Sequence, residues 1–165
     1  MLRCVAFDCF GTVFDMSPVP RMEVSDYVRH VRKNDFTPYN FPESWQTLQA
    51  HPDSREGIEK IRRAGICCVA LSNGSVELIR NISKLNFIEW DHIVDLIQHQ
   101  VYKPNIAAYR TVEIDLNILP AETLMVTANP TFGDLEGAEA IGMRSQLVRN
   151  GFPATITELA SLLGI

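Results

Sequence analysis

Short apolar runs alternate with amphipathic stretches along most of the chain. The apolar runs predict buried strands at residues 3–7, 66–71, 92–96, 123–127 and 145–148. The amphipathic stretches predict helices at residues 54–64, 75–85, 104–115, 134–141 and 156–163. Strands that alternate with helices are typical of right-handed βαβ units. The pattern therefore predicts an α/β fold in which helices cover both faces of a parallel sheet.

The segment from residue 15 to residue 53 breaks this alternation. It is rich in proline and contains one amphipathic stretch at residues 24–31 and the aromatic residues Tyr39, Phe41 and Trp45. We expect a small, partly helical insertion here and a core made of residues 1–14 and 54–165. The aromatic residues either close over the mouth of the sheet or only pack the insertion onto the core. If they form an exposed surface, the chain is expected to form a homodimer.

Composition indicates an ordinary globular protein. The chain has 165 residues, of which 46% are hydrophobic and 21% charged, and a net charge of -5. This acidic balance gives no support for nucleic-acid binding, and no apolar run is long enough to span a membrane. The four cysteines lack metal-ligand or CxxC spacing, and the N-terminus does not read as a signal peptide. We therefore expect a cytoplasmic protein with reduced thiols.

Four loops that follow predicted strands carry polar residues. Parallel strands deliver their carboxyl ends to one edge of a sheet, so these loops are expected to meet there. Lys103 precedes a proline that is expected to start a helix, which would fix the lysine backbone and aim its ammonium group. Taken singly, each of these residues is more often a turn, a cap or a solvated side chain. The residues expected at this edge are Asp8, Thr12, Ser72, Asn73, Lys103, Thr127, Asn129 and Asp134.

Asp8 is the candidate nucleophile among these residues. It ends the first apolar run, and Gly11 and Thr12 follow it closely. Glycine permits a sharp turn, and a threonine hydroxyl can hold the acid or a bound anion. A carboxylate in this position can form a covalent ester or an acyl-phosphate. Cys9 is a second nucleophile to consider, but no histidine lies near it in the sequence, so we expect a buried structural thiol.

In this order the four loops resemble the motifs of the haloacid dehalogenase superfamily of hydrolases. Residues 7–12 (FDCFGT) resemble the first motif and residues 71–74 (LSNG) the second. Residues 102–104 (YKP) resemble the third, and residues 126–129 with 134–138 resemble the fourth. The resemblance covers nearly all of the chain outside the insertion. It implies a Rossmann-like core with a cap inserted after the first strand, and a hydrolase with Asp8 as its nucleophile.

Two positions distinguish the branches of this superfamily. Most members are magnesium-dependent phosphatases, whose first motif has a second aspartate that protonates the leaving alkoxide. Phe10 stands at that position and cannot transfer a proton, whereas a halide leaves without such help. The Thr127-Ala128-Asn129 string also lacks the metal-binding acid of the phosphatases and resembles the Ser-Ser-Asn of the 2-haloacid dehalogenases. That branch needs no metal, so the resemblance implies no cofactor and a small anionic substrate.

The resemblance also implies roles for individual residues. Asp8 would attack the substrate Cα, Lys103 would neutralise and orient Asp8, and Thr12 would support the Asp8 carboxylate. The residues expected to line the substrate site are Phe10, Ser72, Asn73 and Tyr109. The residues expected to orient Lys103 and the hydrolytic water, or to contact substrate, are Thr127, Asn129 and Asp134.

Two departures from the family pattern leave alternatives open. The loop from Asn129 to Asp134 is longer than in the family, so Asp134 is expected to be displaced. The insertion is shorter than a dehalogenase cap, and Arg29 or Arg32 would have to receive the halide unless both lie on a solvated helix face. One alternative is a phosphatase whose Mg²⁺ would be held by Asp8, the Phe10 backbone and Asp134, which is a sparse ligand set. Another is an inactive binding module.

Overall fold

The computed structural model describes all of residues 1–165 and has an α/β architecture. Five parallel strands form one sheet in the order β3-β2-β1-β4-β5. The strands are β1 (Cys4–Phe7), β2 (Cys67–Ala70), β3 (His92–Ile93), β4 (Thr123–Thr127) and β5 (Arg144–Leu147). The predicted parallel sheet is therefore confirmed. From β1 the chain adds β2 and β3 on one side and then β4 and β5 on the other, so the order of strands switches between β1 and β4. This is the switch point beside which open α/β sheets place their ligands.

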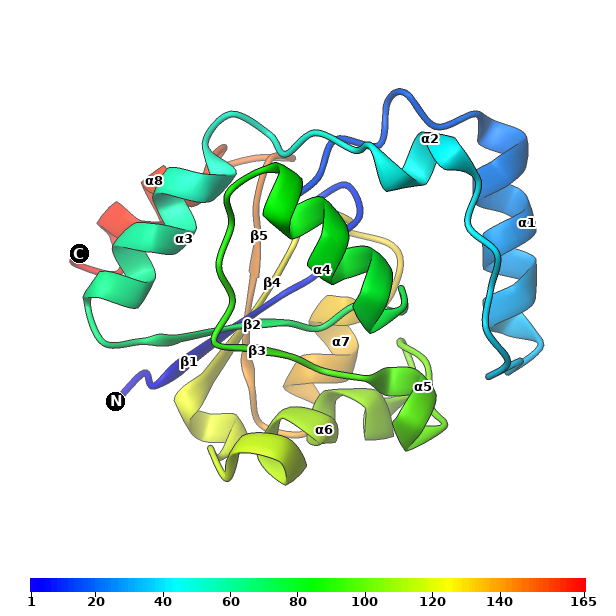
Figure 1. Ribbon diagram of the computed structural model, residues 1–165. Helices are drawn as coiled ribbons and strands as arrows, with labels where there is room; N and C mark the ends of the chain where they lie inside the picture. The colour runs from blue at the N-terminus through cyan, green and yellow to red at the C-terminus, as the bar shows by residue number, and fades with distance from the viewer.

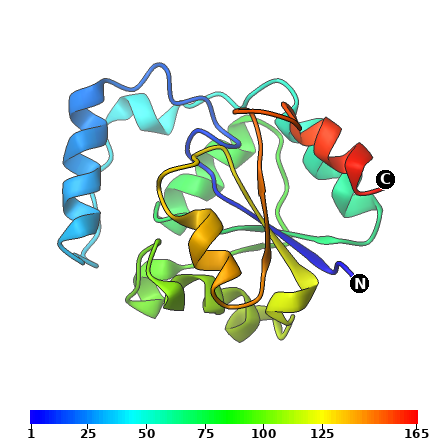
Figure 2. The same ribbon diagram turned by 180° about the vertical axis from the view of Figure 1, so that it is seen from behind.

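Helices connect the strands and cover both faces of the sheet (Figures 1 and 2). The helices of the core are α3 (Ser54–Arg63), α4 (Val76–Leu85), α5 (Leu96–His99), α6 (Ile106–Leu116), α7 (Asp134–Glu139), α8 (Ile156–Leu162) and the 3-10 helix η1 (Pro120–Glu122). The insertion contains α1 (Arg21–Arg32) and α2 (Glu43–Gln46). None of the helices is both long and apolar enough to cross a bilayer.

Most predicted elements agree with the structure within two residues. The strand predicted at residues 92–96 ends at Ile93, because Asp95 caps a short helix that begins at Leu96. The helix predicted from Pro104 begins at Ile106, because the Asn105 side chain accepts a hydrogen bond from the Ala107 amide. The sequence pattern did not reveal α2, α5 or η1, which are too short to show a period. The expected N-cap at Ser75 is confirmed.

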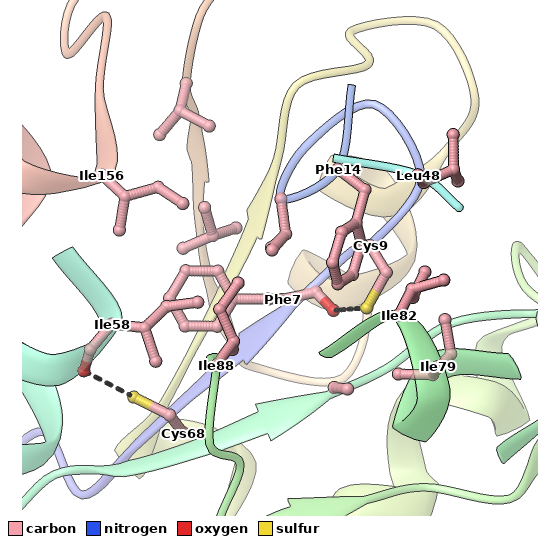
Figure 3. Packing of buried hydrophobic residues seen from close by; sticks show 14 of the residues in the cluster. Phe7, Cys9, Phe14, Leu48, Ile58, Cys68, Ile79, Ile82, Ile88 and Ile156 are labelled. Atoms are coloured by element: carbon pink, nitrogen blue, oxygen red, sulfur yellow. Dashed lines mark hydrogen bonds between the residues drawn. The ribbon is translucent and has the colours of Figure 1, made fainter. Parts of the chain in front are cut away.

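Alternate residues of the central strands enter two separate apolar layers. Val5 and Phe7 of β1 face the layer formed with α3, α4 and α8, whereas Cys4 and Ala6 face the layer formed with α5, α6 and α7. Figure 3 shows Phe7 at the centre of the first layer, close to Ile58 of α3. Burial on both faces explains why these strands read as continuous apolar runs.

The aromatic residues Tyr39, Phe41 and Trp45 of the insertion pack against the core. Trp45 and Phe41 are 1% and 8% exposed, and both belong to the same apolar layer as Phe7. The centroid of the Phe10 ring lies 5.1 Å from that of the Trp45 ring and 6.1 Å from that of the Tyr27 ring. The interpretation that these residues pack the insertion onto the core is therefore confirmed. The exposed aromatic surface that would have favoured a homodimer is not formed by Phe41 and Trp45.

The contact between α3 and α8 depends on a glycine and tests the packing directly. A Cβ added at Gly57 would lie 2.5 Å from the Ile156 Cγ2 and 2.7 Å from its backbone carbonyl carbon. We expect Gly57→Ala to lower the free energy of unfolding by roughly 1–3 kcal/mol. The destabilisation from overpacking the α3–α8 contact exceeds the stabilisation from the higher helix propensity of alanine. Urea denaturation measures this loss. Glu56→Ala, at an exposed position of the same helix, is the control, and an equal or higher stability for Gly57→Ala would contradict the packing.

Candidate active site

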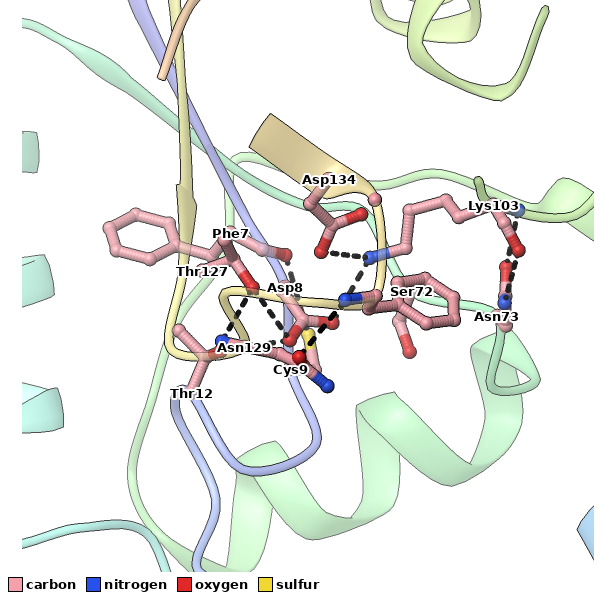
Figure 4. A network of polar contacts seen from close by, with 12 residues as sticks. Phe7, Asp8, Cys9, Thr12, Ser72, Asn73, Lys103, Thr127, Asn129 and Asp134 are labelled. Carbon is pink, nitrogen blue, oxygen red and sulfur yellow. Dashed lines mark hydrogen bonds and ion pairs between the residues drawn. The ribbon is translucent and has the colours of Figure 1, made fainter. Parts of the chain in front are cut away.

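Asp8 lies at the carboxyl end of β1 with its side chain turned toward Lys103. Its amide donates to the carbonyl of Val126 at 2.9 Å, which extends the β1–β4 pairing to the start of the loop. The Lys103 Nζ lies 3.0 Å from the Asp8 Oδ1 (Figure 4). The first and third predicted loops therefore converge, as the topology of the sheet requires.

A second carboxylate, that of Asp134, completes an ion cluster around the same ammonium group. The Lys103 Nζ lies 3.3 Å from the Asp134 Oδ2. The Tyr109 hydroxyl donates to the Asp134 Oδ1 at 2.6 Å. Both oxygens of Asp134 are therefore occupied by donors, and the cluster carries one positive and two negative charges when all three groups are ionised. We call Asp8, Lys103 and Asp134 the ion cluster below.

Two threonines hold the other oxygen of Asp8. The Thr12 hydroxyl lies 2.8 Å from the Asp8 Oδ2, and the Thr127 hydroxyl lies 3.4 Å from the same atom. The Thr12 oxygen also accepts a hydrogen bond from the Ala128 amide at 2.9 Å. Because that contact uses an oxygen lone pair, the single hydroxyl proton of Thr12 is directed to Asp8. The loops after β1 and β4 are thereby joined at the Asp8 carboxylate.

Asn73 fixes the backbone of Lys103. Its side-chain oxygen accepts from the Lys103 amide at 2.8 Å, and its side-chain nitrogen donates to the Lys103 carbonyl at 3.0 Å. The expectation that a helix starting at Pro104 holds Lys103 was wrong, because the helix starts two residues later. A reciprocal amide–backbone pair serves that purpose instead. Both polar atoms of the Asn73 side chain are engaged by Lys103, although the sequence suggested contact with substrate.

The loop before α7 brings Asp134 into the ion cluster despite its length. Asn129 folds the loop on itself, since its side-chain oxygen accepts from the amides of Thr131 and Phe132 at 3.0 Å each. Gly133 has a φ of 119°, and a Cβ there would lie 2.8 Å from the Cβ of Pro104. A glycine is therefore required for the loop to pass beside Pro104. Although we expected the longer loop to displace Asp134, its Oδ2 lies within 3.3 Å of the Lys103 Nζ.

Burial and charge act against each other on Asp8. Loss of solvent raises the pKa of the Asp8 carboxyl, the Lys103 ammonium opposes that rise, and the charge of Asp134 adds to it. The net pKa of Asp8 lies above the usual aspartate range. For Lys103, burial alone would lower the pKa, but the carboxylates of Asp134 and Asp8 raise it above its usual value. The ammonium therefore stays charged throughout the neutral pH range.

Asp8 is the only member of the ion cluster with access to solvent. Its side chain is 16% exposed, whereas those of Lys103 and Asp134 are 1% and 0% exposed. A small molecule that enters this edge of the sheet meets the Asp8 carboxylate first. Asp8 therefore has the exposure that a nucleophile needs, and Lys103 and Asp134 can act only through it.

The neighbouring Cys9 does not offer a competing nucleophile. Its side chain is fully buried, and its thiol lies 3.7 Å from the carbonyl of Phe7. Burial, and secondarily the charge of Asp8, raise the pKa of the Cys9 thiol far above the neutral range. The thiol therefore remains protonated, as expected for a structural cysteine.

Phe10 and Ser72 lie together beside the start of α4. A Cβ added at Gly74 would meet the Phe10 ring at 2.8 Å and the Ser72 Oγ at 3.3 Å. The Ser72 hydroxyl accepts from the Gly74 amide at 3.0 Å. Phe10 thus separates the polar loop after β2 from the aromatic residues of the insertion.

Arg29 and Arg32 are not brought to the ion cluster. Both are exposed on α1, and Arg29 forms an ion pair with Asp26 at 3.3 Å. No hydrogen bond or ion pair links either arginine to Asp8 or Lys103. Figure 1 shows α1 at the far end of the insertion, away from the sheet. Their position agrees with the alternative of a solvated helix face.

The residues present do not suit a divalent metal ion. No group of three or more His, Cys, Asp or Glu side chains is arranged to hold one. The two acids suggested as ligands, Asp8 and Asp134, share the Lys103 ammonium, and Tyr109 donates to the remaining oxygen of Asp134. A hard dication prefers several free carboxylate oxygens, and these are already occupied by hydrogen-bond donors.

Two residues beside the site were missed by the sequence analysis. Arg149, after β5, donates to the Thr12 carbonyl at 2.7 Å and pairs with Asp53 at 2.9 Å. The only sequence signal for Asp53 is its position immediately before α3. Nothing in the local pattern marks Arg149, because its partners are remote along the chain.

Comparisons with known proteins identify a matching family and similar sequences and structures. The family of haloacid dehalogenase-like hydrolases matches residues 23–142, a range that begins after Asp8. Haloacetate dehalogenase H-2 of Moraxella sp. (strain B) is 30% identical over 102 residues, which are 61% of this chain and 45% of that protein. The chain spans about half the length of the curated relatives it matches.

Solved structures share the fold. The crystal structure of a defluorinating L-2-haloacid dehalogenase has a TM-score of 0.77 and 24% identity, and the match covers 99% of this chain and 96% of that one. The L-2-haloacid dehalogenase from Xanthobacter autotrophicus with chloropropionic acid covalently bound has a TM-score of 0.73 and 18% identity, with 99% and 88% covered. At these identities the likeness shows the Rossmann-like fold alone.

The ion cluster predicts how Asp8 titrates. We expect Lys103→Met to raise the pKa of Asp8 further, because the opposing ammonium is lost while Asp134 remains. Carbon-13 NMR titration of the Asp8 carboxyl measures the shift. Lys84→Met, at an exposed position of α4, is the control and should leave the titration unchanged.

The same variant tests the effect of the cluster on stability. Lys103→Met leaves the buried Asp134 and the partly exposed Asp8 without their cation, and we expect it to lower the free energy of unfolding at neutral pH by roughly 3–5 kcal/mol. Because the pKa of Asp8 is higher in the folded than in the unfolded state, the folded protein gains stability where Asp8 is protonated. The loss of stability in Lys103→Met should therefore shrink as the pH falls through the raised pKa of Asp8. Urea denaturation at several pH values measures it. A loss that does not depend on pH would contradict the assignment.

Proposed function

Because the chain belongs to the family of haloacid dehalogenase-like hydrolases, we propose that it is a metal-independent 2-haloacid dehalogenase with Asp8 as its covalent nucleophile. The observation that carries this proposal is the partly exposed Asp8 carboxylate, paired with the buried Lys103 ammonium 3.0 Å away. The names of the curated relatives and the covalently bound chloropropionic acid of the Xanthobacter enzyme support it.

The proposed reaction has two steps at the Asp8 carboxyl group. An Asp8 oxygen attacks the substrate Cα, the carbon–halogen bond breaks, and the halide leaves with its electron pair. Water then adds to the Asp8 carbonyl carbon of the resulting ester, and the bond from that carbon to the ester oxygen breaks. A 2-hydroxy acid is released, Asp8 is regenerated, and one proton passes to solvent. Lys103 keeps its proton throughout and offsets the charge that develops on the carboxyl oxygen.

Phe10 favours halide over alkoxide as the leaving group. A phosphatase of this family would need a proton donor at the position of Phe10, whose ring instead packs against Trp45 at 5.1 Å. The occupied oxygens of Asp134 also speak against the magnesium-dependent alternative. The proposed enzyme therefore requires no cofactor.

A small anionic substrate fits the polar groups beside Asp8. The N-terminus of α4 follows Ser72 and Gly74, and its free amides favour a carboxylate. In this proposal Ser72, Phe10 and the loop that holds Thr127 and Asn129 surround the substrate, while Asn73 and Tyr109 position Lys103 and Asp134. Because Arg29 and Arg32 lie on an exposed helix face, we assign the halide to neither.

We also propose that residues 15–53 form a cap and that residues 1–14 and 54–165 form the core. The chain leaves and re-enters the core through an antiparallel contact between Phe14 and Ala50. The Asp15 amide donates to the Gln49 carbonyl at 2.8 Å, and the His51 amide donates to the Val13 carbonyl at 2.9 Å. This short ladder supports the proposed boundary. A cytoplasmic location stays a prediction from the sequence.

Halide release tests the proposal. The wild-type protein is expected to release chloride from 2-chloropropionate or chloroacetate, and the rate should not change when a chelator is added. Asp8→Asn is expected to lower the rate by at least roughly a thousandfold, because an amide is a poor nucleophile. Asp26→Asn, on an exposed face of α1, is the control for loss of a negative charge.

The reaction leaves a covalent trace as well. Mass spectrometry of the wild-type protein quenched during turnover should detect an ester on the peptide that contains Asp8. Phosphate release that a chelator abolishes would favour the magnesium-dependent alternative. The absence of both halide release and an adduct would favour a binding module without catalysis.

A further inference from the structure

A fifth loop, which follows β5, reaches the same edge of the sheet as the four loops predicted from the sequence. Arg149 in this loop has a φ of 70°, a left-handed conformation that is costly for a residue with a side chain. Its amide donates to the Pro153 carbonyl at 3.2 Å. The Asn150 side chain donates to the carbonyl of Ala128, in the loop after β4. Such conformations persist only where the surrounding contacts enforce them, and they cluster at functional sites.

The Arg149 guanidinium is held by two residues at the start of α3. Its Nη1 and Nη2 lie 2.9 Å and 3.3 Å from the two oxygens of Asp53, and Nη2 also donates to the Ser54 hydroxyl at 3.2 Å. The side chains of Arg149 and Asp53 are 15% and 14% exposed. Asp53 accepts a further hydrogen bond from the Ile156 amide at 2.7 Å. This fork geometry leaves the guanidinium little freedom to rotate.

The remaining nitrogen of Arg149 acts on the nucleophile loop. Its Nε donates to the Thr12 carbonyl at 2.7 Å. Thr12 is fully buried, and its hydroxyl donates to the Asp8 Oδ2 at 2.8 Å. A carbonyl and a side chain of one residue share the same Cα, so a shift of the Thr12 backbone displaces its hydroxyl and, through it, the Asp8 carboxylate.

We propose that Arg149 is a positioning residue for Asp8, acting through Thr12, and that Asp53 holds it in place. This inference rests on the proposed function, because its effect is read from Asp8 chemistry. A lysine cannot replace the arginine fully, since a single ammonium does not reproduce the planar fork that meets Asp53 and the Thr12 carbonyl together. The arrangement also links the nucleophile loop to the residue at which the insertion ends.

The first test compares Arg149→Met and Arg149→Lys with the wild-type protein in halide release from 2-chloropropionate. We expect kcat to fall about tenfold to a hundredfold for Arg149→Met, since a displacement near one ångström costs about that much. The fall should be smaller for Arg149→Lys, and KM should change by less than about threefold in both, because no substrate contact is lost. Arg62→Met is the matched control, as Arg62 pairs with Glu89 and Asp91 on another part of the core.

Two further readouts separate positioning from a general loss of structure. The Thr12 hydrogen bond lowers the pKa of Asp8, so the acid limb of the rate profile should move to higher pH in Arg149→Met and stay in place in Arg62→Met. The double variant Thr12→Val with Arg149→Met should be no slower than Thr12→Val alone, because both changes break one chain of contacts.

The outcomes are distinct. If the wild-type protein releases no halide, the proposed function fails before Arg149 is tested. If it does, an unchanged kcat and acid limb in Arg149→Met, or fully additive losses in the double variant, would overturn the role of Arg149. Circular dichroism and thermal unfolding show whether Arg149→Met folds. If it does not fold, Arg149→Lys tests the role of Arg149. A kcat and acid limb in that variant equal to those of the wild-type protein would overturn the inference equally.

Discussion

One buried ammonium group held between a buried carboxylate and a partly exposed one is the interaction on which the rest of this structure depends. Removing three ions from water costs several kcal/mol per ion, and the mutual attraction offsets that cost only where the remaining lone pairs are satisfied. Here Thr12 and Thr127 occupy the free oxygen of Asp8, and Tyr109 occupies that of Asp134. The loops after four strands are bound together by this requirement.

The ion cluster also explains why Lys103 is immobile and Asp8 is accessible. Lys103 is fixed at its backbone by Asn73 and at its ammonium by the two acids, so it has no freedom to leave Asp8. A charge that cannot move provides preorganised stabilisation at no cost during reaction. Asp8 alone keeps an exposed edge. The cluster thus presents one partly exposed carboxylate and buries the two charged groups that act on it.

The insertion affects the site mainly through Phe10. That ring lies between Ser72 and Gly74 on one side and the buried Trp45 and Tyr27 on the other. A side chain that completes an aromatic cluster is not free to serve as a proton donor, which couples the packing of the insertion to the chemistry allowed at Asp8. The same packing leaves the arginines of α1 in solvent, so this short insertion differs from a cap that supplies a cation.

The sequence determined the α/β class and the order of its strands and longer helices through the periodicity of apolar residues and the turn residues between them. It also indicated that Asp8, Thr12, Lys103 and Thr127 lie together, since parallel topology forces loops at one sheet edge to meet. The path of the loop before Asp134 was not decided locally, because it depends on Gly133 passing Pro104. Likewise, only the tertiary structure assigned Asn73 to the Lys103 backbone and joined Arg149 to Thr12 and Asp53. Contacts between residues far apart in sequence leave no periodic or local signal, so the folded chain alone specifies them.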